Sequence, residues 1–216
     1  GVVSTTLLAG CSSGTTDASG STQKGSCDAA VATAKAAVKT AVDNSSPWTG
    51  PTTGPKAVGG KQIVFVAQTL TNPGVAGVAK GVKEAAGAIG WQVRVLDGQG
   101  DQSGISAAFG QALSVKPDGI IVGGFDPNTI SAQIKQANDA GIPVIGWHAL
   151  SEPGPSTSPK LFSNVTTKVS DVAQISAQWI IAKSDGAAGV VVFTDNSIPF
   201  AAGKAKMIED DLKACS

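Results

Sequence analysis

Six polar or aromatic residues lie just after predicted strands of this chain. They are Gln68, Thr69, Asn72, Asp126, Trp147 and His148. Amide and carboxylate groups exchange hydrogen bonds with hydroxyls, and a tryptophan offers a flat apolar face with one N–H donor. Such a combination suits the hydroxyls and the C–H faces of a sugar ring. The residue types therefore predict non-covalent binding of a small hydroxylated molecule, provided that the fold brings them together.

Four short apolar runs supply the strands that would position these residues. The runs cover residues 63–67, 92–96, 119–122 and 143–146, and an amphipathic helix pattern separates each from the next. They recur roughly every 25–30 residues, which is the length of a βα unit. Parallel strands built in this way bind ligands at their carboxyl ends. We therefore expect an α/β fold in which the polar residues share one edge of the sheet.

Two of the candidates also have a purely structural role. Asn72 and Asp126 each stand directly before a proline, which is the pattern of a helix N-cap followed by its first residue. Capping uses only part of either side chain, so contact with a ligand is compatible with it. A further strand is predicted at residues 189–193. Asp195 follows it, where a second half of the protein would face the first, and could accept hydroxyl hydrogen bonds.

Several function classes are disfavoured by what the chain lacks. Lysine plus arginine and aspartate plus glutamate balance at 16 each, and no basic run exists, which argues against nucleic-acid binding. Tyrosine is absent and His148 is the single histidine, so few groups could serve acid–base catalysis or hold a metal. The glycines between Gly98 and Gly104 have the wrong spacing and follow the wrong strand for a dinucleotide fingerprint. We expect neither an enzyme nor a cofactor.

The amino-terminal segment, residues 1–11, is apolar and ends in Leu-Ala-Gly-Cys. This ending resembles the lipobox of bacterial lipoproteins, which implies a remnant of a signal peptide and a lipid on Cys11. An ordinary tail with a chance cysteine is the alternative. Residues 12–60 are rich in Ser, Thr, Gly and Pro, and we expect a flexible stalk with one helix, 28–42, capped by Asp28.

Cys27 and Cys215 are the two remaining cysteines, and in an oxidising compartment they suggest a disulfide. Alternatively, the partner of Cys215 lies beyond the end of the chain. The predicted elements divide the chain into an amino-terminal α/β lobe at 61–150, a crossing hinge at 151–168, and the start of a second α/β lobe at 169–216. A lone buried strand cannot stand without partners, so we expect this sequence to be truncated.

Four stretches, 63–74, 95–99, 116–121 and 140–145, resemble the ribose-type periplasmic sugar-binding proteins in order and composition. The resemblance implies the type I periplasmic-binding-protein fold: two lobes, each a doubly wound parallel sheet, with the second incomplete here. By position, the family's asparagine after the first strand falls on Asn72. The aromatic pair that often follows is Gly74-Val75 in this chain, and an acidic–basic pair is replaced by His148-Ala149. These departures imply a less charged pocket and a ligand other than a simple pentose.

The resemblance also implies a role and a location. We expect the lipid-anchored, extracytoplasmic solute-binding component of a bacterial sugar ABC importer, with a sugar and the transporter permease as partners. The membrane would be contacted through the lipid alone, and nucleic acid would not be bound. A periplasmic sugar sensor of a chemotaxis or two-component system, or the core of a LacI-type regulator, remains an alternative. The predicted ligand contacts are Gln68, Thr69, Asn72, Asp126, Trp147, His148 and Asp195.

Overall fold

The computed structural model describes residues 21–43, 47–48, 50–194 and 199–215. Cys11 and Asp195 therefore lie outside the described residues. The elements, in chain order, are α1 (Ser21–Val42), β1 (Gln62–Ala67), α2 (Pro73–Ala88), β2 (Gln92–Asp97), α3 (Gln102–Ser114), β3 (Gly119–Gly123), η1 (Pro127–Ile130), α4 (Ser131–Asp139), β4 (Val144–Trp147), β5 (Gly154–Thr157), β6 (Lys160–Val165), α5 (Val169–Ser184), α6 (Pro199–Leu212) and η2 (Lys213–Cys215).

The strands form one six-stranded sheet in the order β2-β1-β3-β4-β6-β5. All neighbouring pairs are parallel except β5 and β6, which pair antiparallel. From β1 the chain goes first to β2 on one side and then to β3 on the other. The direction of winding therefore reverses between β1 and β3, and in open α/β sheets a ligand crevice opens at the carboxyl ends of such strands.

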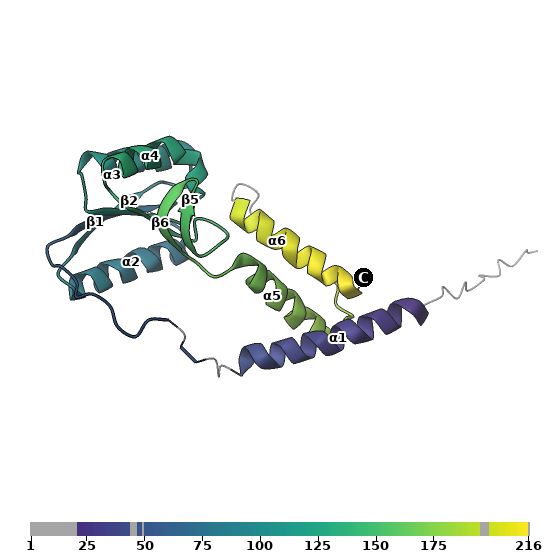
Figure 1. The fold of residues 1–216 in the computed structure, drawn as a ribbon. Coiled ribbons are helices and arrows are strands. Elements are labelled where there is room, and N and C mark those ends of the chain that lie inside the picture. The colour runs from purple at the N-terminus through teal and green to yellow at the C-terminus, as the bar shows by residue number, and fades with distance from the viewer. Residues whose placement is uncertain (1–20, 44–46, 49, 195–198, 216) are drawn as a thin grey trace, which may run out of the picture.

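Helices cover both faces of the sheet, as expected for a doubly wound fold (Figure 1). On one face α3 and α4 pack on alternate residues of the strands, with Phe109 and Ile134 at the centre of the larger core. On the other face α2 packs on Phe65 and Ala67 through Val75 and Ala79. Successive side chains of β1 thus point to opposite helical layers, and the predicted α/β fold class is confirmed.

The sequence indicated that the first lobe ends at residue 150, but the sheet continues beyond that residue. We expected 151–168 to be an exposed loop and a segment crossing to a second lobe. Instead β5 and β6 extend the sheet, and β6 lies parallel to β4 with Ile145 opposite Ser163. The short strand β5 contains Pro155 and lies at the sheet edge, where a missing N–H does no harm. The chain leaves the sheet only after Val165 and enters α5 at Val169.

The amino-terminal helix differs from its prediction in length and in place. α1 begins at Ser21, so Asp28 lies within the helix and does not cap it. The helix packs against α5 and does not stand in a flexible stalk (Figure 1). Val31 and Ala34 form a buried cluster with Ile181 of α5. The structure joins Cys27 of α1 to Cys215 of η2 by a disulfide, with Cα atoms 4.8 Å apart.

The helices α5 and α6 extend away from the sheet, side by side (Figure 1). Residues 187–194 connect them, and this segment includes the predicted strand at 189–193. It is not a strand in the structure, because no other strand among the described residues lies beside it. Its side chains are correspondingly open to solvent, with Phe193 92% and Val191 78% exposed.

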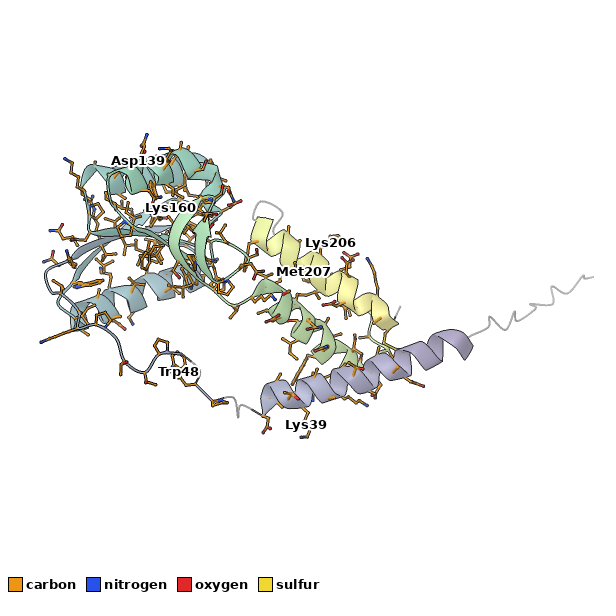
Figure 2. The ribbon with its side chains drawn as sticks, viewed as in Figure 1. Lys39, Trp48, Asp139, Lys160, Lys206 and Met207 are labelled. Atoms are coloured by element: carbon orange, nitrogen blue, oxygen red, sulfur yellow. A yellow bond between two sulfur atoms is a disulfide. The ribbon has the colours of Figure 1, made fainter. Side chains whose placement is uncertain are left out.

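Trp48 belongs to the linker between α1 and β1. Its side chain is large and mainly apolar, yet it is 75% exposed and projects from the linker (Figure 2). Its indole N–H donates to the carbonyl of Pro51, 3.3 Å away. The far end of the linker is fastened to the sheet, where the Trp91 indole donates to the carbonyl of Val58 at 2.6 Å.

Candidate ligand-binding cleft

A cavity of about 440 Å³ opens at the carboxyl ends of β1, β3 and β4 and is bounded on its other side by α6. The sheet edge is held together there by backbone bonds that continue beyond the strands. Gln68 N–H donates to the carbonyl of Gly123, and Gly124 N–H donates to that of Trp147. Five of the predicted contacts line this cavity, namely Gln68, Asn72, Asp126, Trp147 and His148.

Asn72 occupies the end of the cavity beside α2. Its Oδ1 accepts the backbone N–H groups of Gly74 and Val75 at 2.9 and 3.3 Å, so it caps the helix as predicted. Its Nδ2 group has no acceptor among the described residues. The cap thus fixes the side chain while two donors are left for a ligand.

Asp126 lies across the cavity from α6, at the start of η1. Its Oδ1 accepts from the backbone N–H of Asn128 at 2.9 Å and from the Asn128 side-chain amide at 2.8 Å. The predicted cap is therefore confirmed here as well. The second carboxylate oxygen accepts from no donor among the residues that the structure describes, and it can accept hydroxyl hydrogen bonds.

Trp147 forms the flat part of the wall. Its side chain packs against the apolar cluster that contains Phe65 and Val75. The adjacent Gly124 has a φ of +82°, and a Cβ there would come within 3.1 Å of Val75 and 3.7 Å of the indole. A side chain at position 124 would therefore both strain the backbone and fill space next to the ring.

His148 connects the sheet side of the cavity to α6. Its φ is +45°, an uncommon backbone conformation for a residue with a side chain. Its Nδ1 lies 3.3 Å from the hydroxyl of Thr166, and its ring meets those of Trp147 and Phe200 edge-on, with centroids 4.8 and 5.7 Å apart. Burial, followed by the nearby charge of Lys204, lowers the pKa of His148 from its ordinary value of 6.5.

This lowered pKa predicts how acid affects the protein. As pH falls below about 6.5, the unfolded chain binds the proton before the folded one does, so the free energy of unfolding decreases. We expect His148→Gln to lose less stability than wild type between about pH 7 and pH 5, measured by urea denaturation without ligand. The two proteins should show the same pH dependence at alkaline pH. An equal loss in acid would contradict a neutral imidazole in the fold.

A buried asparagine supports the loop that carries His148. Asn164 of β6 is only 2% exposed. Its amide donates to the carbonyls of Leu150 and Glu152 at 2.9 and 2.7 Å, and its Oδ1 accepts the N–H of Ala149 at 3.3 Å. These three bonds hold the chain that turns away from β4. The sequence contained one signal, a polar residue in a mainly apolar stretch, which we did not recognise.

We expect Asn164→Ala to lower the free energy of unfolding by about 2–3 kcal/mol, because it leaves buried backbone groups without partners. The mutation should also weaken ligand binding by releasing the loop after β4. Ser163→Ala on the same strand is a matched control, since the Ser163 hydroxyl forms no hydrogen bond with another described residue. Equal urea midpoints for the two variants would contradict a supporting role for Asn164.

The prediction of site residues was incomplete in two respects. Thr69 does not line the cavity, because its hydroxyl is turned to that of Thr71, 2.9 Å away. In contrast, Phe200, Lys204 and Met207 of α6 do line it, although the sequence did not single them out as contacts. Their side of the cavity depends on how α6 is placed against the sheet, which no local pattern specifies.

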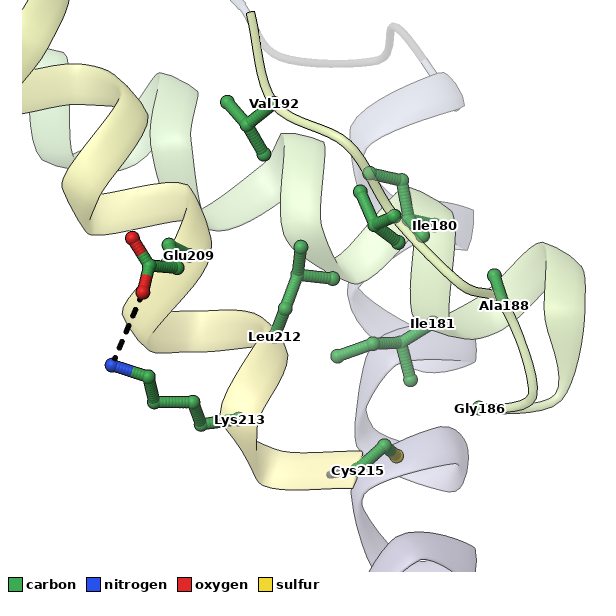
Figure 3. A pocket seen from close by; sticks show the side chains of 10 residues that line it. Ile180, Ile181, Gly186, Ala188, Val192, Glu209, Leu212, Lys213 and Cys215 are labelled. Carbon is green, nitrogen blue, oxygen red and sulfur yellow. Dashed lines mark ion pairs between the residues drawn. The ribbon is translucent and has the colours of Figure 1, made fainter.

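A second cavity, of about 500 Å³, lies between α5 and α6 (Figure 3). Its lining is mainly aliphatic, with Ile180, Ile181 and Leu212 facing it, and Cys215 lies at one end. Its two charged residues, Glu209 and Lys213, pair with each other at 3.6 Å. We therefore regard it as unfilled packing space between helices and not as a site with polar groups directed at a ligand.

Among the residues that the structure describes, no group of three or more His, Cys, Asp or Glu side chains is arranged to hold a metal ion. None of the described helices combines the length and the apolar character that a membrane span requires.

Comparison with protein families matches residues 63–207, which is more than half of the chain, to the periplasmic binding protein domain. The chain belongs to this family. Among curated proteins no match was found.

Solved structures of ABC sugar-binding proteins share the fold of this periplasmic binding protein domain. An ABC sugar transporter subunit from Rhodobacter sphaeroides is 19% identical, with a TM-score of 0.62, and the match covers 73% of this chain and 54% of that one. A glucose-galactose binding protein from Geobacillus stearothermophilus is 20% identical, with a TM-score of 0.61, and the match covers 71% of this chain and 54% of that one. A periplasmic ribose ABC transporter protein from Conexibacter woesei is 19% identical, with a TM-score of 0.56, and the match covers 74% of this chain and 53% of that one. The chain thus spans about half the length of these structures.

Proposed function

We propose that this protein binds a small carbohydrate in the cleft between the sheet edge and α6. The observation that carries the proposal is the single cavity wall formed by Asn72, Asp126, Trp147 and His148. It offers an apolar ring face next to amide donors, a carboxylate acceptor and a neutral imidazole. The sugar ring would lie against the indole while its hydroxyls bond to the groups around it.

The proposal includes delivery of the sugar to an ABC importer. Support comes from the family and from solved structures of similar fold whose names describe sugar transport. The protein would act outside the cytoplasm, held at the membrane by a lipid on Cys11, and would dock on a permease when the cleft is closed. It would catalyse no reaction, because binding and release suffice for delivery.

We further propose that α1, α5 and α6 belong to a second lobe of which this chain contains only the start. The exposed apolar segment around Val191 and Phe193 supports this, since large unpaired apolar stretches are normally covered. The aliphatic cavity between α5 and α6 adds to the argument, because a sheet packed on these helices would fill it. The cleft would then close as the lobes rotate about the segment after β6.

The proposal is tested with the protein encoded by the whole gene. A panel of neutral mono- and disaccharides and cyclitols, each at millimolar concentration, is screened by thermal denaturation. A ligand that binds only the folded state raises the melting temperature. We expect at least one sugar to do so. A folded protein that responds to none of them, nor to sugars bearing an acidic group, would overturn the proposal.

A further inference from the structure

We propose that the bound sugar carries one anionic group and that Lys204 binds this group. The inference deepens the proposed function and rests on it, because it concerns the same cavity. Among the described residues that line the cavity, Lys204 is the one lysine and Asp126 the one carboxylate. Compensation of the positive charge of Lys204 therefore depends on which anionic groups lie near it.

The helix itself offers Lys204 no counter-ion. Positions three and four residues away along α6 are Phe200, Ala201, Met207 and Ile208, none of which is acidic. Other lysines near the end of the chain are paired, as shown by Lys206 with Asp210 at 2.9 Å and Lys213 with the same residue at 2.7 Å. Lys206 points to the outer surface of the same helix, whereas Lys204 lines the cavity.

The surroundings of Lys204 make an uncompensated charge costly. The side chain is only partly exposed, and its Nζ lies over the ring of Phe200, 5.6 Å from the centroid. Met207 continues the apolar surface one turn further along α6. Closure of the cleft on a ligand would remove more water from the ammonium group, so an anion within reach would stabilise the closed state.

No protein group in the described part of the cavity provides that anion. None of the ion pairs among the described residues joins Asp126 to Lys204, and Asp126 Oδ1 already accepts two bonds from Asn128. His148 is uncharged near neutral pH, because burial and Lys204 itself lower its pKa. A ligand with a negative charge on the side facing α6 satisfies Lys204, while its hydroxyls remain available to Asn72 and Asp126.

The chemistry required is a hydroxylated ring with one carboxylate or phosphate. Trp147 would lie under the ring, and the anionic substituent would extend from it toward α6. Lysine is a point charge and accepts either anion, so sugar acids and sugar phosphates are separate arms of one experiment. A neutral sugar would offer the ammonium group only uncharged hydroxyl oxygens as acceptors, and so would stabilise the closed cleft less.

The experiment compares matched ligands on the protein encoded by the whole gene, by isothermal titration. Glucose is compared with glucuronate and glucose 6-phosphate, and galactose with galacturonate and galactose 6-phosphate. We expect the anionic member of at least one set to bind about tenfold or more tightly than its neutral parent. Lys204→Gln should abolish this advantage. Lys206→Gln, which removes the same charge from the same helix, should preserve it.

The outcomes separate the inference from the proposed function. The inference is supported if the carboxylate, the phosphate or both bind more tightly than the neutral sugar, and if Lys204→Gln alone loses this difference in affinity. The ligand that binds more tightly then identifies the anion. Neutral sugars that bind as tightly as their anionic counterparts overturn it and leave sugar binding intact. An advantage that survives in Lys204→Gln, or that is lost equally in Lys206→Gln, also overturns it. Failure of every sugar to bind would overturn the proposed function itself.

Discussion

Replacing Trp147 by alanine is expected to abolish the thermal stabilisation that the sugar gives to wild type. The indole supplies a large flat surface at the end of β4, where it packs against the apolar cluster of β1 and α2 and meets the His148 ring edge-on. An aromatic face contributes its buried area and about 0.5–1.5 kcal/mol of specific ring contact in addition. Its loss should therefore weaken binding by at least tenfold, as measured by titration calorimetry.

Two controls show whether the loss concerns the ring itself. Trp147→Phe retains a ring and should keep part of the affinity, while Trp48→Ala removes an indole that is 75% exposed on the linker and should change nothing. Because Trp147 also packs on the buried cluster, the urea midpoint of each variant is measured without ligand. Binding by a folded Trp147→Ala protein with wild-type affinity would contradict the site.

The second large effect is expected from the disulfide that fastens α1. Cys27 and Cys215 lie 188 residues apart in the sequence, so the bond restricts much of the unfolded chain. Bonds of this kind typically contribute about 2–4 kcal/mol. We expect the double variant Cys27→Ser/Cys215→Ser to unfold at lower urea concentration. We also expect α1 to be released first, because its buried cluster with Ile181 is small, with Val31 and Ala34 as the buried members from α1, and the Lys35–Asp185 ion pair beside it lies on the surface.

Limited proteolysis detects that release directly. Cleavage in the linker between α1 and β1 should be faster in the double variant, and also in wild type treated with a reductant. Thr33→Ala, on an exposed position of the same helix, should be cleaved at the wild-type rate. If the double variant resists both urea and protease as well as wild type does, the helix is held by packing alone and the disulfide is not needed.

The sequence predicted those parts of the fold that depend on local pattern. Alternating apolar runs and proline-marked helix starts located β1 to β4 and the caps at Asn72 and Asp126. Because parallel strands end at one edge, five of the predicted contacts could be brought together without knowledge of tertiary structure. Thr69 directly follows Gln68 in the sequence, but its hydroxyl lies beside that of Thr71 and it does not line the cavity.

Features set by distant contacts were not predictable in this way. α1 looked like part of a stalk because its partner Ile181 comes 150 residues after Val31. The sequence predicts a loop and a crossing segment where the structure has β5 and β6. The pairing of β6 with β4 depends on a free sheet edge, which no local pattern reveals. The role of Asn164 arises only once the loop after His148 folds back over it. The side of the cavity that α6 forms, including Lys204, likewise depends on packing between helices.

Sugar binding in the cavity at the ends of β1, β3 and β4 can be measured in solution. Its most direct test is a calorimetric titration of the protein encoded by the whole gene with the sugars that raise its melting temperature, repeated with Trp147→Ala and Trp48→Ala. We expect saturable binding with one site per chain, unchanged by Trp48→Ala and lost or at least tenfold weaker in Trp147→Ala. Saturable binding that is unaffected by Trp147→Ala, or no binding by any sugar to the folded protein, would contradict it.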